Sequence, residues 1–504
     1  MSYILAIDIG TSSAKTVLFD ASIAQIIAEA SHEYPIHKPT PERAEQNPDD
    51  WWAAVVYTTQ QVMATSAVNP ADIAAIGLTG QMHGTVLIDA NHQPIHPAII
   101  WADQRSAEQV EQLTATLGTE NYVAIAGTLP AAGFMGATLL WLYQHTDLLE
   151  LTHYVIFPKD YIRLRLTGET ATEISDAAAS GIFDVRAQSW SERIIKAAGL
   201  PDHIFPTILG STDIAGTLTM SAAAALGLRS GTPVVAGCAD QPAQAIANGL
   251  IVPGRASVTT GSGGQVFAPL SLADDAPLPV DPRLHVLNHA VPDSAYILGA
   301  MLSAGLALRW LRGITGLSGV PDAYAILSAS AATVRPGADG LIFLPYLTGE
   351  RTPHMNPSAR GVFFGLSDYH GRGHLARAVM EGVAFALRQI LEITLPLSGD
   401  VETIIATGGG AESDVWRGIQ ADVFGLPLQK SLLREQTCIG AAVLAGVGTG
   451  VYASLDQACE SVRRYGAVTA PVADHHAAYQ PIYDRFLRLY PLLKNEMGEQ
   501  IIHD

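Results

Sequence analysis

Three glycine-rich turns in this sequence have the residue types that hold phosphate groups. Each follows a β-prone run, and the turns are centred on Gly10, on Gly261 and on residues 408–410. Small side chains in a tight turn let backbone N–H groups and hydroxyls approach an anion closely. One such turn is weak evidence of a phosphate site, because ordinary hairpins and strand–helix connections contain turns of the same kind. None of the three has the P-loop spacing, and the third also lacks the Rossmann spacing.

The first two turns echo each other. Residues 4–19 are predicted to form a strand, a Gly-Thr-Ser turn and a second strand, and residues 255–268 repeat this order. We interpret the echo as an internal duplication of one hairpin, with chance similarity as the alternative. Together with the third turn, it predicts a polyphosphate held between two similar domains.

Two aspartates stand where they could take part in phosphoryl transfer. Asp8 ends the first strand of the first hairpin, where its carboxylate could hold a divalent cation beside the phosphate. Asp240 follows the apolar run 233–238, and ligands bind at the carboxyl ends of strands in α/β sheets. It could orient and deprotonate an attacking hydroxyl. The alternative is a helix N-cap before Pro242, which the local sequence alone slightly favours.

Four residues of the first half could contact a sugar. Met82 and His83 lie between two predicted strands, and the imidazole could donate to a sugar hydroxyl. Trp101 could offer an apolar face, and Asp103 an acceptor for a hydroxyl. The alternatives are a structural histidine, a core tryptophan and a turn aspartate.

Alternating strands and helices must position these residues. Strands are predicted at residues 4–7, 14–19, 73–78, 85–88, 233–238, 341–347 and 403–407, and helices at 51–65, 375–393, 412–424 and 438–445. The alternation favours an α/β fold. Asp49 or Asp50 is expected to cap the helix that begins at Trp51. A chain of 504 residues is too long for one hydrophobic core, and residues 249–254 are a natural domain boundary.

Composition excludes several classes of function. The formal net charge of -19 argues against a general binder of nucleic acid or anionic membranes, but not against a small anionic ligand. Cys238, Cys438 and Cys459 are far apart, which fits a reducing, cytoplasmic setting. The N-terminus has no signal-peptide pattern. Glycine or proline interrupts the uncharged runs 121–146 and 437–455, so buried helices with loops are predicted there rather than membrane spans.

At these motifs the chain resembles the FGGY family of carbohydrate kinases, within the actin-like ATPase superfamily. DIGTSS with Lys15 is similar to the superfamily's first phosphate motif, TTGSGG at residues 259–264 to the second, and ATGGGAES at 406–413 to the adenosine motif. GVFFGL with the helix after it, and residues 344–361 before it, resemble the family's C-terminal signature. The resemblance implies two ribonuclease-H-like domains with a cleft between them. It also implies that residues 1–246 hold the sugar and 247–504 the ATP.

The resemblance also implies roles for the candidate residues. It makes Asp240 the catalytic base and assigns Asp8 to Mg²⁺. The remaining assignments fall into three groups, which are Gly10, Thr11, Ser12, Lys15, Thr260, Gly261, Ser262 and Gly263 for the phosphates, Gly409, Gly410 and Ala411 for adenosine, and Met82, His83, Trp101, Asp103, Asp240 and Gln241 for the sugar.

Within the family, three segments are most similar to members that phosphorylate D-xylulose at O5. They are GQMHG at 80–84, the Trp101 segment and PKDYIRLRLTG at 158–168. Another ketopentose, a polyol or gluconate is the alternative substrate. A sugar-independent ATPase switch and a sugar-binding regulator without catalysis are alternatives of another class. A homodimer is a family expectation.

Overall fold

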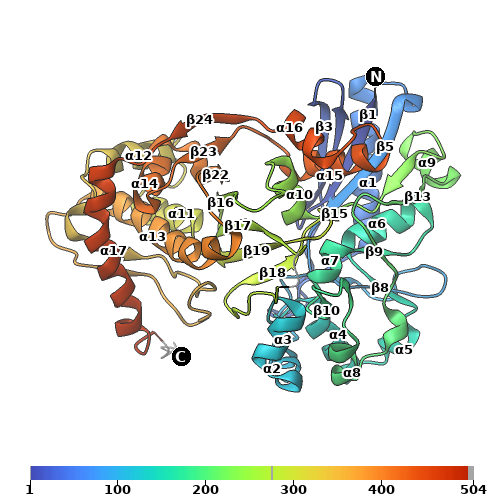
Figure 1. Ribbon diagram of the computed structural model, residues 1–504, viewed down its shortest axis with the longest axis horizontal. Helices are drawn as coiled ribbons and strands as arrows, with labels where there is room; N and C mark the ends of the chain where they lie inside the picture. Colours follow the sequence, from blue (N-terminus) through green and yellow to red (C-terminus); the bar gives the residue numbers. More distant parts are fainter. Residues whose placement is uncertain (1, 274–275, 498–504) are drawn as a thin grey trace. The chain divides into compact units, whose positions relative to one another are not determined.

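The computed structural model describes residues 2–273 and 276–497, which form two compact units. Unit 1 comprises Met1–Ile251, Ser271–Tyr296 and Leu433–Arg463, and unit 2 comprises Val252–Leu270, Ile297–Leu432 and Arg464–Asp504. Both units combine sheets with helices, which confirms the α/β prediction (Figure 1). The expected division after residue 246 lies near Ile251, where the first stretch of unit 1 ends. Two later stretches also pack with unit 1, so neither unit is one continuous segment.

Unit 1 is built on a sheet whose strands follow the order β13-β14-β5-β1-β2-β3, with β15 also paired to β5. Strands β1 (Tyr3–Ile9) and β2 (Ser13–Asp20) form the predicted antiparallel hairpin, in which Ile9 pairs with Ala14. Strand β5 (Ile73–Gly80) runs parallel to β1. Strand β15 (Cys238–Ala239) pairs with the end of β5 and leads directly into Asp240. The sheet therefore brings Asp8 and Asp240 to the carboxyl ends of its parallel strands.

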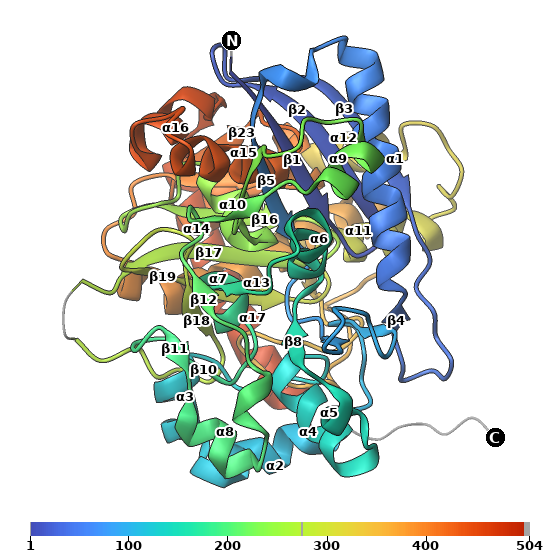
Figure 2. The ribbon, with the colours of Figure 1, turned by 90° about the vertical axis from the view of Figure 1, so that its right-hand side faces the viewer.

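Helices cover both faces of this sheet. Leu5, Ile7 and Ile9 belong to a core cluster with residues of α1 (Pro48–Ser66), whereas Ile4 and Ala6 belong to a cluster with residues of α15 (Gln436–Gly448). Figure 2 shows α1 on one side of β1–β3 and α15 on the other. Burial on both faces explains why β1 reads as an unbroken apolar run rather than an alternating one.

The first long helix begins earlier than the sequence pattern predicts. Helix α1 starts at Pro48, and its N-cap is Asn47, whose side chain accepts a hydrogen bond from Asp49 N. The prediction of Asp49 or Asp50 as the cap is therefore wrong. Proline fits the first helical position because it needs no N–H partner there, and the residue before it then becomes the cap.

The other elements of unit 1 are short. Its further helices are α2 (Ala107–Leu117), α3 (Thr119–Ala126), α4 (Met135–His145), α5 (Leu148–Leu151), α6 (Pro158–Thr167), α7 (Ile174–Ala178), α8 (Glu192–Ala198), α9 (Met220–Leu226), α10 (Asp240–Ala247) and α16 (Leu455–Val462). Its further strands are β3 (Gln25–Glu33), β4 (Glu45–Gln46), β6 (Val86–Ile88), β7 (Ala98–Ile99), β8 (Tyr154–Ile156), β9 (Thr172–Glu173), β10 (Phe183–Asp184), β11 (Ser189–Trp190), β12 (Ile208–Leu209), β13 (Ile214–Thr217), β14 (Pro233–Val235) and β18 (His285–Asn288).

The sheet of unit 2 repeats the arrangement of unit 1. Its strands follow the order β19-β17-β16-β22-β23-β24, and β16 (Ala256–Thr260) and β17 (Gly264–Ser271) form the second predicted hairpin. Strand β22 (Ile404–Thr407) runs parallel to β16, as β5 does to β1. The two hairpins thus occupy the same place in two sheets of the same order, as the echo in the sequence predicts.

The core of unit 2 gathers around α13 (Arg372–Ser398). Residues of this helix share one apolar cluster with strand residues such as Val258 and Val266, and Figure 1 shows α14 beside α13. The remaining elements are α11 (Gly305–Ile314), α12 (Ala323–Ala332), α14 (Asp414–Phe424), α17 (Ala473–Leu493), β19 (Ser294–Met301), β20 (Ile342–Leu344), β21 (Val362–Phe364), β23 (Leu428–Ser431) and β24 (Tyr465–Thr469).

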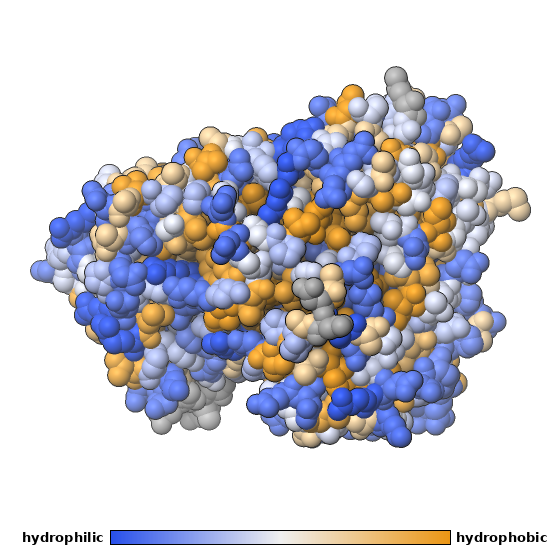
Figure 3. All heavy atoms as spheres, in the orientation of Figure 1, coloured by the Kyte–Doolittle hydropathy of each residue, from blue (hydrophilic) through white to orange (hydrophobic). Residues whose placement is uncertain are grey.

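In the described part of the chain, no helix combines the length and apolar character needed to cross a membrane. The uncharged run 121–146 contains α4 and most of α3, and the run 437–455 lies mostly in α15. Hydrophilic residues are spread widely over the face drawn in Figure 3.

Candidate active site

Asp8 lies in unit 1 near the end of β1, beside the first glycine turn. One of its carboxylate oxygens, Oδ2, accepts a hydrogen bond of 2.7 Å from Thr437 Oγ1, while Oδ1 is buried and has no partner among the described residues. Burial raises the pKa of Asp8, and the nearby Lys15 ammonium acts in the opposite direction. A carboxylate with one buried, unbonded oxygen is suited to a cationic ligand.

The turn after β1 is fixed by hydrogen bonds from distant residues. Gly10 N donates to Ser13 O at 3.0 Å, and the Gln46 side-chain amide donates to Thr11 O at 2.7 Å. The Trp101 indole N–H donates to Thr11 Oγ1 at 2.9 Å, although 41% of the residue is exposed. Trp101, predicted to contact the sugar, therefore lies against the predicted phosphate turn. Gln46 carries no motif signal and was not predicted.

Lys15, predicted to contact phosphate, forms an ion pair. Its ammonium lies 2.7 Å from Glu435 Oε2, and its side chain is 38% exposed. Glu435 immediately precedes α15, the helix that also carries Thr437. Glu435 and Thr437 therefore contact the first hairpin although more than four hundred residues separate them from it in the sequence. No local sequence signal could have indicated these contacts.

Asp240 is the first residue of α10, directly after β15. The alternative of an N-cap is not what the structure shows, because the cap position is Ala239 and α10 has no side-chain cap. Asp240 Oδ1 is buried without a hydrogen-bond partner among the described residues. Burial, and secondarily the charge of Asp8, raise the pKa of Asp240 to about 7, while the amides of Gln241 and Asp240 act against the rise. A carboxylate that titrates near neutral pH is suited to accept a proton.

Met82 and His83 lie in the same unit. Met82 is buried, and His83 Nδ1 lies 2.7 Å from the carbonyl oxygen of Ala179. The imidazole stacks on Phe134 with ring centroids 3.8 Å apart and an angle of 5° between the planes. Its backbone has φ of 71°, an uncommon conformation for histidine. These contacts fix the orientation of the ring.

Asp103 is fully buried, and protein groups surround its carboxylate. Its Oδ2 accepts from Ala44 N at 2.7 Å, and the Arg105 guanidinium donates to both oxygens. Arg105 also forms an ion pair with Glu45. This geometry does not support Asp103 as a sugar ligand, and we expect it to hold the loop that presents Trp101.

Unit 2 contains a cavity of about 790 Å³ at the second and third glycine turns. Thr260, Gly261 and Ser262 line it together with Gly409 and Gly410, so the structure brings these five predicted residues together. The other lining residues come mainly from α11, α12 and the start of α14 and are Gly305, Leu308, Arg309, Tyr324, Ala325, Ser328, Ala329, Glu412, Ser413, Asp414, Val415 and Trp416. Gly263 and Ala411 do not line this cavity. Its size falls in the range of small-molecule sites.

Glycine is required where the third turn meets the second. Gly408 has φ of +80°, and a Cβ there would lie 2.7 Å from Thr260 O. A Cβ on Gly410 would lie 2.4 Å from Thr260 Cγ2. The threonine is itself fixed, because Gln420 Nε2 donates to its Oγ1 at 3.0 Å. The two turns can therefore approach closely only without side chains.

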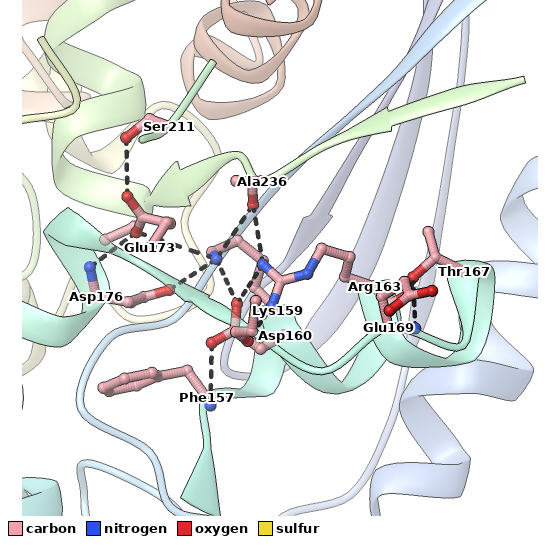
Figure 4. Close-up of polar contacts among 12 residues, drawn as sticks. Phe157, Lys159, Asp160, Arg163, Thr167, Glu169, Glu173, Asp176, Ser211 and Ala236 are labelled. Atoms are coloured by element: carbon pink, nitrogen blue, oxygen red, sulfur yellow. Dashed lines mark hydrogen bonds and ion pairs between the residues drawn. The ribbon is translucent and has the colours of Figure 1, made fainter. Parts of the chain in front are cut away.

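Five charged residues form a buried cluster that the sequence motifs did not predict. Lys159 Nζ lies 2.7 Å from Asp160 Oδ1 and 3.2 Å from Asp176 Oδ2 (Figure 4). Glu173 lies 4.0 Å from the same ammonium, and Arg163 is 2.9 Å from Asp160. All five side chains are fully buried. Charged residues in a short helix usually face solvent, so only the tertiary structure shows that every residue of α6 except Arg165 is buried.

Among the described residues, no group of three or more histidine, cysteine, aspartate or glutamate side chains could hold a metal ion. Mg²⁺ does not need such a cage, because one or two carboxylates, water and substrate phosphates can complete its coordination. The unbonded Oδ1 of Asp8 fits this mode of binding.

The chain is similar in sequence and fold to known proteins. Sequence models of the FGGY family of carbohydrate kinases match residues 3–247 for the N-terminal domain and 257–449 for the C-terminal domain. A xylulose kinase of Bacillus subtilis is 33% identical over 98% of this chain and 98% of its own length. A gluconokinase of the same organism is 31% identical over 98% of this chain and 97% of its own length.

A solved structure shares the fold along the whole chain. The crystal structure of xylulose kinase from Rhodospirillum rubrum superposes with a TM-score of 0.91 at 30% identity, covering 99% of this chain and 100% of the other. The resemblance found from the sequence motifs, and the ribonuclease-H-like fold that it implies, are thereby confirmed.

Proposed function

Because the chain belongs to the FGGY family of carbohydrate kinases, we propose that it transfers the γ-phosphoryl group of ATP to the O5 hydroxyl of D-xylulose. The observation that carries the proposed mechanism is Asp240, a half-buried residue at the start of a helix, whose Oδ1 is buried and unbonded and whose pKa is raised to about 7. It accepts the proton of the attacking hydroxyl as the new O–P bond forms and the bond between the γ-phosphorus and ADP breaks.

The cavity of unit 2 is the proposed site of the nucleotide. Its apolar walls, among them Leu308 and Trp416, suit a purine ring. Arg309 lines the same cavity, and its guanidinium donates to Ser262 Oγ at 2.8 Å, which puts a positive charge beside the second glycine turn. Gly409 and Gly410 border the adenosine in this proposal, whereas Ala411, the next residue, does not line the cavity.

Asp8 is the proposed protein ligand of Mg²⁺. When bound, the ion would neutralise charge on the phosphate oxygens. The hydrogen bond from Thr437 orients the Asp8 carboxylate and leaves Oδ1 available. Gly10, Thr11 and Ser12 would position the phosphate group nearest to the sugar.

The sugar is proposed to bind in unit 1. Met82, His83, Trp101 and Gln241 are the candidate contacts, and the fixed orientations of His83 and Trp101 suit the directional hydrogen bonding and stacking that a sugar needs. The names of the relatives favour D-xylulose. Gluconate is the second candidate, because a gluconokinase matches over nearly the same length at similar identity.

A substrate panel tests the proposal. Purified protein with Mg²⁺ and ATP is assayed for ADP release with D-xylulose, other ketopentoses, polyols and gluconate, and the product is examined by ³¹P NMR. We expect release to depend on the sugar, to be fastest with D-xylulose and to yield a 5-phosphate. ATP turnover that no sugar affects would indicate a nucleotide switch instead. Sugar binding without ADP release would indicate a regulator.

A cytoplasmic location is also proposed. All three cysteines are buried free thiols, which suits a reducing compartment. Labelling with a thiol reagent after denaturation, with and without prior reduction, should give the same number of reactive thiols.

A further inference from the structure

The strand that leads to Asp240 is interrupted. Between β14 and β15 the chain makes a turn at Gly237, where φ is +78° and a Cβ would lie 2.1 Å from Leu78 O. Strand pairing with β5 resumes only at Cys238 and Ala239. Residues 236–239 are all buried, so their backbone polar groups need partners that the sheet does not fully supply.

Side chains and loops of the same unit supply these partners. Gly237 N donates to Ser211 O at 3.1 Å, and Ala236 N donates to Asp213 O at 2.9 Å. The Ala236 carbonyl oxygen lies 3.4 Å from Lys159 Nζ. The Ala239 amide, which directly precedes Asp240, donates to Ser175 Oγ at 3.0 Å. Ser175 is therefore the side chain bound to the backbone nearest the proposed base.

Ser175 is in turn held by the buried charged cluster. Its hydroxyl donates to Glu173 Oε1 at 2.7 Å, and its own amide donates to Glu173 Oε2 at 2.9 Å. Ser211 Oγ also donates to Glu173, at 2.8 Å, so two of the residues that bind segment 236–239, Ser175 and Ser211, meet at one carboxylate. In Figure 4 the Glu173 carboxylate lies between the Ser211 side chain and the Lys159 ammonium.

Stability alone does not account for such a cluster. Removing five charges from water is costly, and apolar side chains of similar volume often stabilise a core equally well. The cluster does, however, fix geometry, because each hydrogen bond and ion pair in it is directional. Lys159 of the cluster and Ser175, which Glu173 holds, contact segment 236–239, which directly precedes Asp240.

We propose that Ser175, fixed by Glu173 and the Lys159 cluster, is a positioning residue that sets the location of the Asp240 carboxylate through the Ala239 amide. The inference rests on the proposed role of Asp240 as base. It concerns turnover and not sugar affinity, because Ser175 has no contact with Met82, His83 or Trp101 among the hydrogen bonds of the described residues.

The first test compares kinetic constants of Ser175→Ala with those of the unaltered protein. We expect kcat to fall by about 10- to 100-fold, since small displacements of a reacting group have effects of this size, and KM for the sugar to stay within about twofold. Ser175→Cys keeps the volume but is a poor acceptor, so it should show the same fall in kcat if the alanine variant does not fold.

Ser191→Ala is the matched control, because Ser191 is also buried and accepts a backbone N–H in the same unit, at the N-cap of α8. It should lose stability but keep kcat.

A double-mutant cycle with Asp240→Asn gives the readout that a merely structural role would not change. If Ser175 acts through Asp240, Ser175→Ala should change the residual turnover of Asp240→Asn by less than about twofold. An equal fall in both backgrounds, a rise in KM without a fall in kcat, or an unchanged kcat in Ser175→Ala would overturn the inference. Asp240→Asn alone tests the proposed base, so the two failures are distinguishable. Full activity of Asp240→Asn would overturn both.

Discussion

Asp240 shows how the surroundings of one carboxyl group determine its chemistry. Water stabilises an ionised carboxylate, and burial withdraws that stabilisation, so the pKa rises. The negative charge of Asp8 adds to the rise, whereas the amides of the first turn of α10 oppose it. The result is a group that can be both proton acceptor and proton donor near neutral pH, which an exposed aspartate cannot be.

The substitution Asp240→Asn tests the role of this residue directly. Asparagine has nearly the same shape but cannot accept the hydroxyl proton, so we expect kcat to fall by about 10²- to 10⁴-fold. Sugar affinity, measured by calorimetry, should change little. Turnover within a few-fold of the unaltered enzyme would contradict the assignment.

The pH dependence of kcat/KM gives a second test at this scale. The base must be deprotonated, so activity should rise with pH through about 7 and level off above it. Stability should respond in the opposite sense. Between the ordinary pKa of 3.8 and about 7 the folded state binds more protons at Asp240 than the unfolded state, so this residue's contribution falls as pH rises. Asp240→Asn should weaken that fall in chemical denaturation series between pH 4 and 7. If kcat/KM falls only far below pH 6, the base does not have the raised pKa of Asp240 and the assignment is wrong.

At the scale of elements, two hairpins and one short helical turn determine where anions can bind. Strand β22 delivers residues 408–410 against Thr260 at the end of β16, and close backbone approach is possible because Gly408 and Gly410 lack side chains. The wall of the cavity in unit 2 is therefore a consequence of how two turns pack.

Gly410→Ala should disturb this packing. Its Cβ would lie 2.4 Å from Thr260 Cγ2, and overpacking of this kind costs about 1–3 kcal/mol. We expect KM for ATP to rise about tenfold, with little change in KM for the sugar. Gly418→Ala is the matched control, because a Cβ at this position in α14 meets nothing within 4 Å. An unchanged KM for ATP in Gly410→Ala would indicate that the nucleotide binds elsewhere.

At the scale of the whole molecule, two sheets of the same order carry different sites. Unit 1 contains Asp8, Asp240 and the candidate sugar residues, whereas unit 2 contains the cavity at the second and third glycine turns. We therefore expect residues of unit 1 to bind the sugar and the cavity of unit 2 to bind the adenosine of ATP.

Thermal shift measurements should separate the two sites. A ligand at 100 times its Kd stabilises the folded state by about 2.7 kcal/mol, so sugar and ATP should each raise Tm. In Gly410→Ala the shift caused by ATP should shrink while the shift caused by D-xylulose remains. Equal loss of both shifts would show that the substitution damages the fold rather than the nucleotide site.

The sequence alone was sufficient for the α/β class, the two hairpins, the three glycine turns and the family. These features depend on local patterns, such as apolar runs, turn residues and short motifs, whose physical meaning does not require distant partners. Only the tertiary structure decided that Asn47 caps α1 and that the Asp103 carboxylate is paired with Arg105. The same holds for the contacts of Ser175 and Lys159 with the chain segment before Asp240. The raised pKa of Asp240 likewise depends on burial and on the charge of Asp8, which lies far away in sequence. Burial and contacts between distant residues arise only when the chain folds, so no local pattern encodes them.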